Sequence, residues 1–266
     1  MSFLSLEQVS HYYYSPTSYT KALENISFSI ADGEFVSIIG PSGCGKSTIL
    51  SLIARIMEQT EGHIYVDGEN INDSSVQIGY MLQQDYLFPW RTIIDNILLG
   101  PKINDTISEE THQQIKQLLD DVHLPGTEQQ YPDELSGGMR QRIALVRTLI
   151  TNPNILLLDE PFSALDYVTK LKLENIVSEM IKRYNKTAVL VTHDLGEAIS
   201  MSDRIILMDA KPGRVAEIFD IPESIRQTEP FYVRRHEEYQ QLFDHIWQYV
   251  SEDTVGERNH NHEGDN

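Results

Sequence analysis

Two kinds of short hydrophobic run occur along this chain, and they predict two kinds of β-strand. Strands buried on both faces are apolar at nearly every position, and helices between them indicate a largely parallel sheet. Four such runs are "EFVSIIG" (34–40), "NILLLDE" (154–160), "TAVLVTH" (187–193) and "RIILMD" (204–209). Runs that alternate apolar and polar residues predict an antiparallel layer instead. Three such runs are "LSLEQVS" (4–10), "NISFSI" (25–30) and "GHIYVDG" (62–68).

Between residues 87 and 150 the strand pattern fades and helical periodicity replaces it. The segment "SEETHQQIKQLLDDV" begins with a capping serine, Ser108, has acids in its first turn, and then spaces its apolar residues as one helix face. We therefore expect a helical subdomain inserted into an α/β core.

These patterns divide the chain into five expected segments. They are an antiparallel layer with the first part of the core (1–86), the helical subdomain (87–150), the second part of the core (151–215), an extension with a helix at 235–250 (216–250) and an acidic, disordered tail (251–266).

Composition and charge narrow the class of partner. The 266 residues are 40% hydrophobic and 23% charged, as in ordinary globular proteins, but the net charge of −19 opposes binding to nucleic acid or an anionic lipid surface. The single cysteine, Cys44, rules out an internal disulfide and suits a reducing compartment. There is no signal-peptide pattern and no apolar run of about 18 residues, the length of a membrane span. We expect a cytosolic, soluble protein that reaches a membrane only through a partner.

The segment "GPSGCGKST" (40–48) predicts a phosphate-binding loop. It follows an apolar run and precedes a helical pattern that extends to Ile56. A G-x-x-x-x-G-K-[ST] sequence at a strand-to-helix turn directs backbone N–H groups at a phosphate, while Lys46 reaches the β- and γ-phosphates and the Ser47 hydroxyl reaches Mg²⁺. The loop residues expected to bind the nucleotide are Gly40, Pro41, Ser42, Gly43, Cys44, Gly45, Lys46, Ser47 and Thr48.

Polar residues at two other strand ends fit the same ligand. "NILLLDEP" ends in adjacent acids, which a buried strand tip does not need for stability. Beside a magnesium-bound triphosphate, Asp159 would hold the metal and Glu160 would polarise the attacking water. His193 ends the next run, where open α/β sheets place ligands, and could contact the γ-phosphate.

The segment "LSGGMRQR" (135–142) predicts a helix start suited to an anion. Ser136 can cap the helix, while Gly137 and Gly138 let another molecule approach the unpaired N–H groups. The chain carries no second nucleotide motif that would fill this site.

Together these segments resemble the ATP-binding subunit of an ATP-binding cassette (ABC) transporter over about residues 4–220. The motifs occur in the family's order: Walker A (40–48), the Q-loop within "MLQQDYLFPW", the signature "LSGGMRQR", Walker B "ILLLDE", the D-loop "SALD" (163–166) and the switch histidine, His193. The resemblance implies a P-loop NTPase (RecA-like) α/β core with an antiparallel β subdomain and an inserted α-helical subdomain.

The resemblance also implies roles for further residues. Gln83, selected over Gln84 by the six-residue step to Pro89, would act in catalysis and at the Mg²⁺ site. An aromatic residue of "HYYY" would stack on adenine; Tyr13 fits best, with Tyr12 and Tyr14 left open. The signature residues Ser136, Gly137 and Gly138 would act in trans, on ATP and Mg²⁺ held by a second ATPase subunit, expected to be another copy of this chain.

Two stretches indicate a branch of the family. "LFPWRTIIDNILLG" resembles a stretch of the importers of nitrate, sulfonates, taurine, bicarbonate and thiamine precursors, with Phe88 in place of the usual leucine, and "KPGRVAEIFDI" resembles a later segment of the same group. This implies a peripheral subunit on the cytoplasmic face of the cell membrane. Permease subunits would dock near Gln83–Trp90, and an extracellular or periplasmic solute-binding protein would complete the importer. Two alternatives are the ATPase subunit of an exporter and an ABC ATPase acting on DNA or the ribosome.

Overall fold

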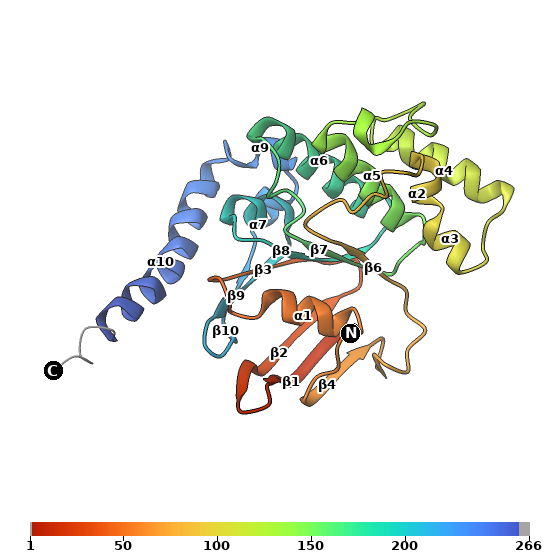
Figure 1. Cartoon of the computed structure of the whole chain (residues 1–266). Helices are drawn as coiled ribbons and strands as arrows, with labels where there is room; N and C mark the ends of the chain where they lie inside the picture. Colours follow the sequence, from red (N-terminus) through yellow and green to blue (C-terminus); the bar gives the residue numbers. More distant parts are fainter. Residues whose placement is uncertain (1, 261–266) are drawn as a thin grey trace.

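The computed structural model describes residues 2–260, and its strands form two sheets (Figure 1). The smaller sheet is antiparallel, in the order β2–β1–β4–β5, and the larger has the order β10–β9–β3–β8–β7–β6. All neighbours in the larger sheet are parallel except β10, which pairs antiparallel with β9 at one edge. The strands are β1 (Ser2–Tyr14), β2 (Tyr19–Ala31), β3 (Phe35–Ile39), β4 (Glu61–Val66), β5 (Glu69–Asn70), β6 (Ile78–Met81), β7 (Ile155–Asp159), β8 (Thr187–Val191), β9 (Arg204–Asp209) and β10 (Arg214–Asp220).

Helices cover the larger sheet, and several connect its strands. The helices are α1 (Lys46–Ile53), α2 (Ile93–Ile97), α3 (Leu99–Ile103), α4 (Glu109–Asp121), the 3-10 turn η1 (Pro132–Glu134), α5 (Gly137–Leu149), α6 (Tyr167–Arg183), α7 (Leu195–Met201), α8 (Glu223–Arg226), α9 (Pro230–Val233) and α10 (Glu237–His260).

The larger sheet is buried on both faces, which explains its uninterrupted apolar runs. In β7, Leu156 and Leu158 face a core shared with α4, α5 and α6. Ile155 and Leu157 face the opposite way, into a core shared with α1 and the smaller sheet. The expected P-loop α/β fold with an antiparallel β layer is therefore confirmed.

The helices from α2 to α5, together with η1, all fall between residues 87 and 150 (Figure 1). Ser108 caps α4 by accepting a hydrogen bond from the Thr111 N–H at 3.2 Å. Within residues 2–260, no helix is both long enough and apolar enough to cross a membrane.

Three local features differ from the sequence interpretation. Strands β5, β6 and β10 were not expected, and α1 ends at Ile53, which leaves Ile56 65% exposed. Helix α10 runs through His260, so residues 251–260 are helical where a disordered tail was expected; extending an existing helix adds one hydrogen bond per residue. Residues 261–266 of that expected tail lie outside the described residues.

The C-terminal elements share a core of their own. Ile225, Val233, Tyr239 and Ile246 are buried with residues of α7 and β9. Figure 1 shows the far half of α10 projecting away from the body of the molecule.

Candidate nucleotide-binding and hydrolysis site

The Walker A loop connects β3 to α1 at the carboxyl edge of the larger sheet. Gly45 has a φ of 92°, and a Cβ there would lie 2.4 Å from the Leu23 side chain, so only glycine fits. Lys46 is 9% exposed, and its Nζ donates hydrogen bonds to the carbonyl oxygens of Gly40 at 2.8 Å and Pro41 at 3.0 Å. The lysine therefore folds back over its own loop, with its charge held by these two carbonyl oxygens.

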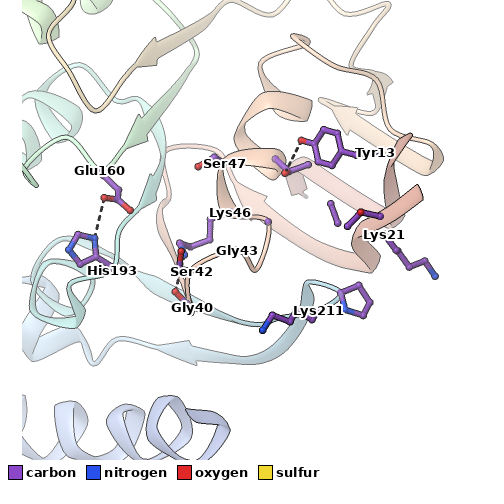
Figure 2. A pocket seen from close by; sticks show the side chains of 15 residues that line it. Tyr13, Lys21, Gly40, Ser42, Gly43, Lys46, Ser47, Glu160, His193 and Lys211 are labelled. Carbon is purple, nitrogen blue, oxygen red and sulfur yellow. Dashed lines mark hydrogen bonds and ion pairs between the residues drawn. The ribbon is translucent and has the colours of Figure 1, made fainter. Parts of the chain in front are cut away.

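A cavity of about 780 Å³ opens beside this loop. Figure 2 shows Glu160 and His193 on one side of the loop and Tyr13 on the other. Three lysines and one carboxylate are among its lining residues, so the cavity favours an anionic ligand although the chain is strongly acidic. The lining residues are Tyr13, Thr20, Lys21, Ala22, Gly40, Ser42, Gly43, Gly45, Lys46, Ser47, Thr48, Glu160, His193, Lys211 and Pro212.

Strand alternation separates the three candidate tyrosines. Tyr13 lines the cavity and shares a hydrogen bond with Thr48 between the two hydroxyl groups, at 3.1 Å. Tyr12 and Tyr14 stack on each other on the opposite face of β1, with ring centroids 6.3 Å apart. Of the three, Tyr13 is the one placed to meet a nucleotide in this cavity.

Glu160 and His193 follow the neighbouring strands β7 and β8 and meet at the cavity wall. Glu160 Oε2 lies 3.2 Å from His193 Nδ1. The backbone of Glu160 has a φ of 46°, a left-handed conformation that non-glycine residues adopt rarely and that clusters at functional sites. The residue after the strand therefore leaves the line of β7, which places its carboxylate beside the imidazole.

Asp159 lies at the tip of β7 and faces α1. Its Oδ1 lies 3.5 Å from Ser47 Oγ, and its Oδ2 accepts a hydrogen bond from the Tyr80 hydroxyl at 3.1 Å. Burial raises the pKa of the Asp159 carboxyl, and the neighbouring Glu160 adds to this, while the Tyr80 hydrogen bond opposes it. Burial and the charge of Asp159 likewise raise the pKa of Tyr80, which keeps the phenol a donor.

The Ser47–Asp159 pair fits a magnesium ion, which takes one or two protein oxygens and completes its shell with water and phosphates. No cluster of three or more His, Cys, Asp or Glu side chains suited to a metal occurs among the described residues. A divalent ion at this place would thus depend on the nucleotide for further ligands.

Gln83 follows β6 and lies next to the catalytic candidates, outside the cavity lining. Its Nε2 lies 3.4 Å from Glu160 Oε2 and donates to Ser163 Oγ in the D-loop at 3.2 Å. The backbone carbonyl oxygen of Gln83 accepts a hydrogen bond from Gln141 Nε2 at 2.9 Å. This contact links the Q-loop to α5, the helix that begins at the signature segment.

The signature segment lies at the start of α5 and contributes no residue to the cavity lining. Ser136 is the N-cap, and its Oγ accepts a hydrogen bond from the Met139 N–H at 3.3 Å. A Cβ on Gly138 would lie 2.3 Å from Thr169 Cγ2 in α6, whereas a Cβ on Gly137 would meet its nearest atom, on Leu165, at 3.8 Å. Gly138 therefore permits close packing of α5 against α6, the helix that follows the D-loop. Gly137 leaves open space at the start of α5.

The structure also separates expected site residues from unexpected ones. Pro41 and Cys44 belong to the Walker A loop but do not line the cavity; Cys44 is fully buried, and burial raises the pKa of its thiol. Lys21 and Lys211 line it, although sequence reasoning assigned neither to the site. The signal for Lys211 was "KPGR": Gly213 donates its N–H to Ala22 O of β2, and a Cβ on Gly213 would lie 2.0 Å from the Cys44 carbonyl oxygen, so glycine lets this turn pack against the loop.

A phosphate-binding loop, an acidic strand end and a histidine around one cation-lined cavity define a P-loop ATPase core. A sequence profile of the family described as "ABC transporter" matches residues 23–163. The chain belongs to the ABC transporter family and is the ATPase subunit of a transporter.

Individual relatives agree with this assignment. The chain is 51% identical to "Uncharacterized ABC transporter ATP-binding protein YtlC" of Bacillus subtilis, over 98% of this chain and 100% of that protein. It is 42% identical to "Aliphatic sulfonates import ATP-binding protein SsuB" of Bacillus cereus, over 82% of this chain and 85% of that protein. A solved dimer of the ATP-binding cassette MJ0796 with ADP and Pi matches with a TM-score of 0.71 and 34% identity, covering 82% of this chain and 99% of that one.

Proposed function

We propose that two copies of this chain hydrolyse Mg-ATP and thereby drive uptake of a small solute through membrane subunits of a bacterial importer. The observation that carries the hydrolysis mechanism is the cavity that unites Lys46 and the Walker A loop with the Glu160–His193 pair. Import is supported by the similarity to SsuB of Bacillus cereus, which is named for the import of aliphatic sulfonates.

In this mechanism the Walker A loop and Lys46 bind the triphosphate, and Tyr13 stacks on the adenine at the other end of the cavity. When ATP arrives, Lys46 exchanges its contacts with the Gly40 and Pro41 carbonyls for phosphate oxygens. Ser47, Asp159 and Gln83 would hold Mg²⁺, which neutralises charge on the phosphate oxygens.

Glu160 and His193 then serve hydrolysis at the γ-phosphate. Glu160 orients the attacking water and accepts its proton, and His193 stabilises charge that develops on the phosphoryl oxygens. The 3.2 Å contact between them restricts both side chains before substrate binds. Gln83, 3.4 Å from Glu160, couples this pair to the Q-loop.

Substituting Glu160→Gln tests the assignment, because the amide keeps the shape but cannot take the proton. We expect kcat to fall by about 10³-fold with ATP affinity retained, and MgATP to trap a dimer. A variant that hydrolyses ATP normally, or stays monomeric with saturating MgATP, would contradict the proposal.

The signature segment is the feature of the chain that favours a dimer. Ser136, Gly137 and Gly138 of each copy would close over the γ-phosphate held by Lys46 of the other, as the anion-binding start of α5 suggests. The dimeric cassette with 34% identity supports the pairing of two copies.

Phe88 and Trp90 form the surface that we propose for the membrane subunits. They lie between Gln83 and α2, are 38% and 70% exposed, and pack together with ring centroids 5.2 Å apart. Trp90→Ala should weaken binding to the permease by about 30-fold, the effect of losing an aromatic anchor, and leave ATPase activity of the isolated chain unchanged. Unchanged assembly and transport would remove this surface from consideration.

The solute class that we propose is a small anion of the sulfonate, taurine or nitrate kind, with thiamine precursors as the second candidate. The test reconstitutes the chain with the permease and solute-binding protein of its importer and measures labelled solute uptake into vesicles. Solute movement out of the cytoplasmic side would favour an exporter instead. Tight binding to DNA or ribosomes, with no effect on vesicles, would favour the non-transport alternative.

A further inference from the structure

Ion pairs hold the C-terminal segment on α6 and, one helical turn away, hold the start of α7 next to His193. Arg234 directly follows α9 and forms two hydrogen bonds with Glu174 of α6: Nη1 to Oε2 at 2.9 Å and Nη2 to Oε1 at 3.1 Å. The Glu174 side chain is fully buried, so this bidentate pair is far from the ordinary surface salt bridge.

A second group of ion pairs lies one helical turn away on α6. Lys170 Nζ contacts Asp194 Oδ2 at 2.6 Å and Glu197 Oε1 at 2.5 Å, both at the start of α7. Glu197 also accepts a hydrogen bond from the Thr192 hydroxyl, and the Asp194 N–H donates to Thr192 Oγ1 at 3.0 Å. The residues on both sides of His193 are therefore fixed by contacts that lead to Lys170, one turn of α6 away from the Glu174 that holds Arg234.

The first turn of α7 is shaped to receive the C-terminal segment. A Cβ on Gly196 would lie 3.1 Å from the Tyr239 hydroxyl and 3.3 Å from Arg234 Nε. Glycine at this position allows α9 and α10 to pack closely on α7, and Figure 1 shows α9 beside α6 and the beginning of α10 near α7.

None of these ion-paired residues is among those that line the cavity described above. The ion pairs are therefore candidates for control of the reaction rather than for the chemistry itself.

We propose that Arg234 is a positioning residue for His193, and that docking of the C-terminal segment onto α6 and α7 sets the rate of ATP hydrolysis. When the segment is docked, Glu174 holds Arg234 against Gly196 at the start of α7, which Lys170 also holds, so that His193 faces the cavity. When it is displaced, nucleotide still binds but hydrolysis slows, because small misplacements of a catalytic group reduce turnover strongly. The inference rests on the role proposed above for His193.

The first test is Arg234→Met, with the exposed neighbour Arg235→Met as a control of equal charge change. We expect kcat to fall by about 10-fold with the ATP dissociation constant within about 2-fold of the parent value, and the control to behave as the parent. Arg234→Lys, which keeps the charge and one hydrogen bond, should restore most of the turnover. A parental kcat in Arg234→Met would overturn the proposal.

Two further variants separate positioning from stability. Removing both members of a buried ion pair costs far less stability than removing one, so Glu174→Met with Arg234→Met should melt near the parent temperature yet remain slow. Gly196→Ala improves the intrinsic helix propensity of α7 but crowds Arg234 and Tyr239, and it too should be slow. Parental kcat in either stable variant would contradict a positioning role.

A double-mutant cycle distinguishes failure of this inference from failure of the proposed function. If Arg234 acts through His193, single-turnover hydrolysis in His193→Ala should be reduced, and adding Arg234→Met should reduce it no further. An additional 10-fold loss in that background would overturn the inference alone. Parental hydrolysis in His193→Ala would overturn the proposed role of His193, and with it this inference.

Discussion

Two helices of this molecule begin at glycine-containing segments that the sequence marks as anion sites, and they differ in what surrounds them. Helix α1 begins after Gly45 within the cavity, and no side chain caps it. Helix α5 begins after Ser136, whose hydroxyl caps it, and this start supplies no residue to the cavity lining.

This difference indicates that the α1 start is a complete phosphate site, whereas the α5 start is only half of one. The α1 start leaves its N–H groups to a ligand and adds Lys46, Ser47 and the Glu160–His193 pair around them. The α5 start is held firmly against α6 at Gly138, yet it has open space at Gly137. An anion-binding helix start that is rigid and without a ligand of its own is what a nucleotide shared between two copies requires.

Removing the cation at the α1 start should produce the largest effect. Lys46→Ala is expected to weaken ATP binding by about 100-fold, because a charged hydrogen-bond donor to phosphate contributes about 3 kcal/mol. Titration with a fluorescent ATP analogue measures this, and Lys116→Ala, at an exposed helix position, is the matched control. Retained affinity would mean that the cavity does not hold the triphosphate at this loop.

A charge placed at the α5 start tests the other half of the comparison. Gly137→Glu should fold normally, because its Cβ has space and an acid in the first turn favours the helix. The carboxylate would face the partner's γ-phosphate, and repulsion of about 3 kcal/mol would lower kcat by about 100-fold. ATP affinity of the single copy should stay within about 2-fold of the parent value, since the α1 start is untouched. Parental turnover would place the signature far from the reaction.

Mixing the two defective variants sharpens the comparison further. In a dimer of Lys46→Ala with Gly137→Glu, one composite site combines the intact lysine of one copy with the intact glycine of the other. If copies exchange randomly, half of the dimers carry one working site of two, so activity should recover to about a quarter of the parental value. No recovery in the mixture would mean that both segments act within one chain.

Much of this site was predictable because hydrophobic periodicity and strand ends report on it directly. The parallel strands β3, β7, β8 and β9 were predicted from their apolar runs, since burial on both faces leaves no polar positions. By contrast, β6 has four residues and includes Gly79, which gives pattern analysis little to use. The early end of α1 depends on Arg55, which has a φ of 59° and donates to the carbonyls of Ile71, Ser74 and Val76.

Long-range packing explains the other omissions. Lys211 reaches the cavity because the turn after β9 packs on β2 and the Walker A loop, and Cys44 turns away from the cavity into the core between the sheets. The contacts of Arg234 with Glu174, and of Lys170 with the start of α7, join residues far apart in the sequence that no local spacing connects. Such contacts exist only once the sheet and its helices are assembled.

The smallest effect expected concerns the cap that distinguishes the two helix starts. Ser136→Ala removes the acceptor for the Met139 N–H, and loss of a serine N-cap should lower the free energy of unfolding by about 1 kcal/mol. Urea unfolding without nucleotide measures this apart from any role of Ser136 in a dimer, and Ser136→Thr, which keeps a hydroxyl, should retain most of the stability. Unchanged stability in Ser136→Ala would show that the α5 start, like that of α1, needs no side-chain cap. The contrast between the two sites would then rest on the cavity alone.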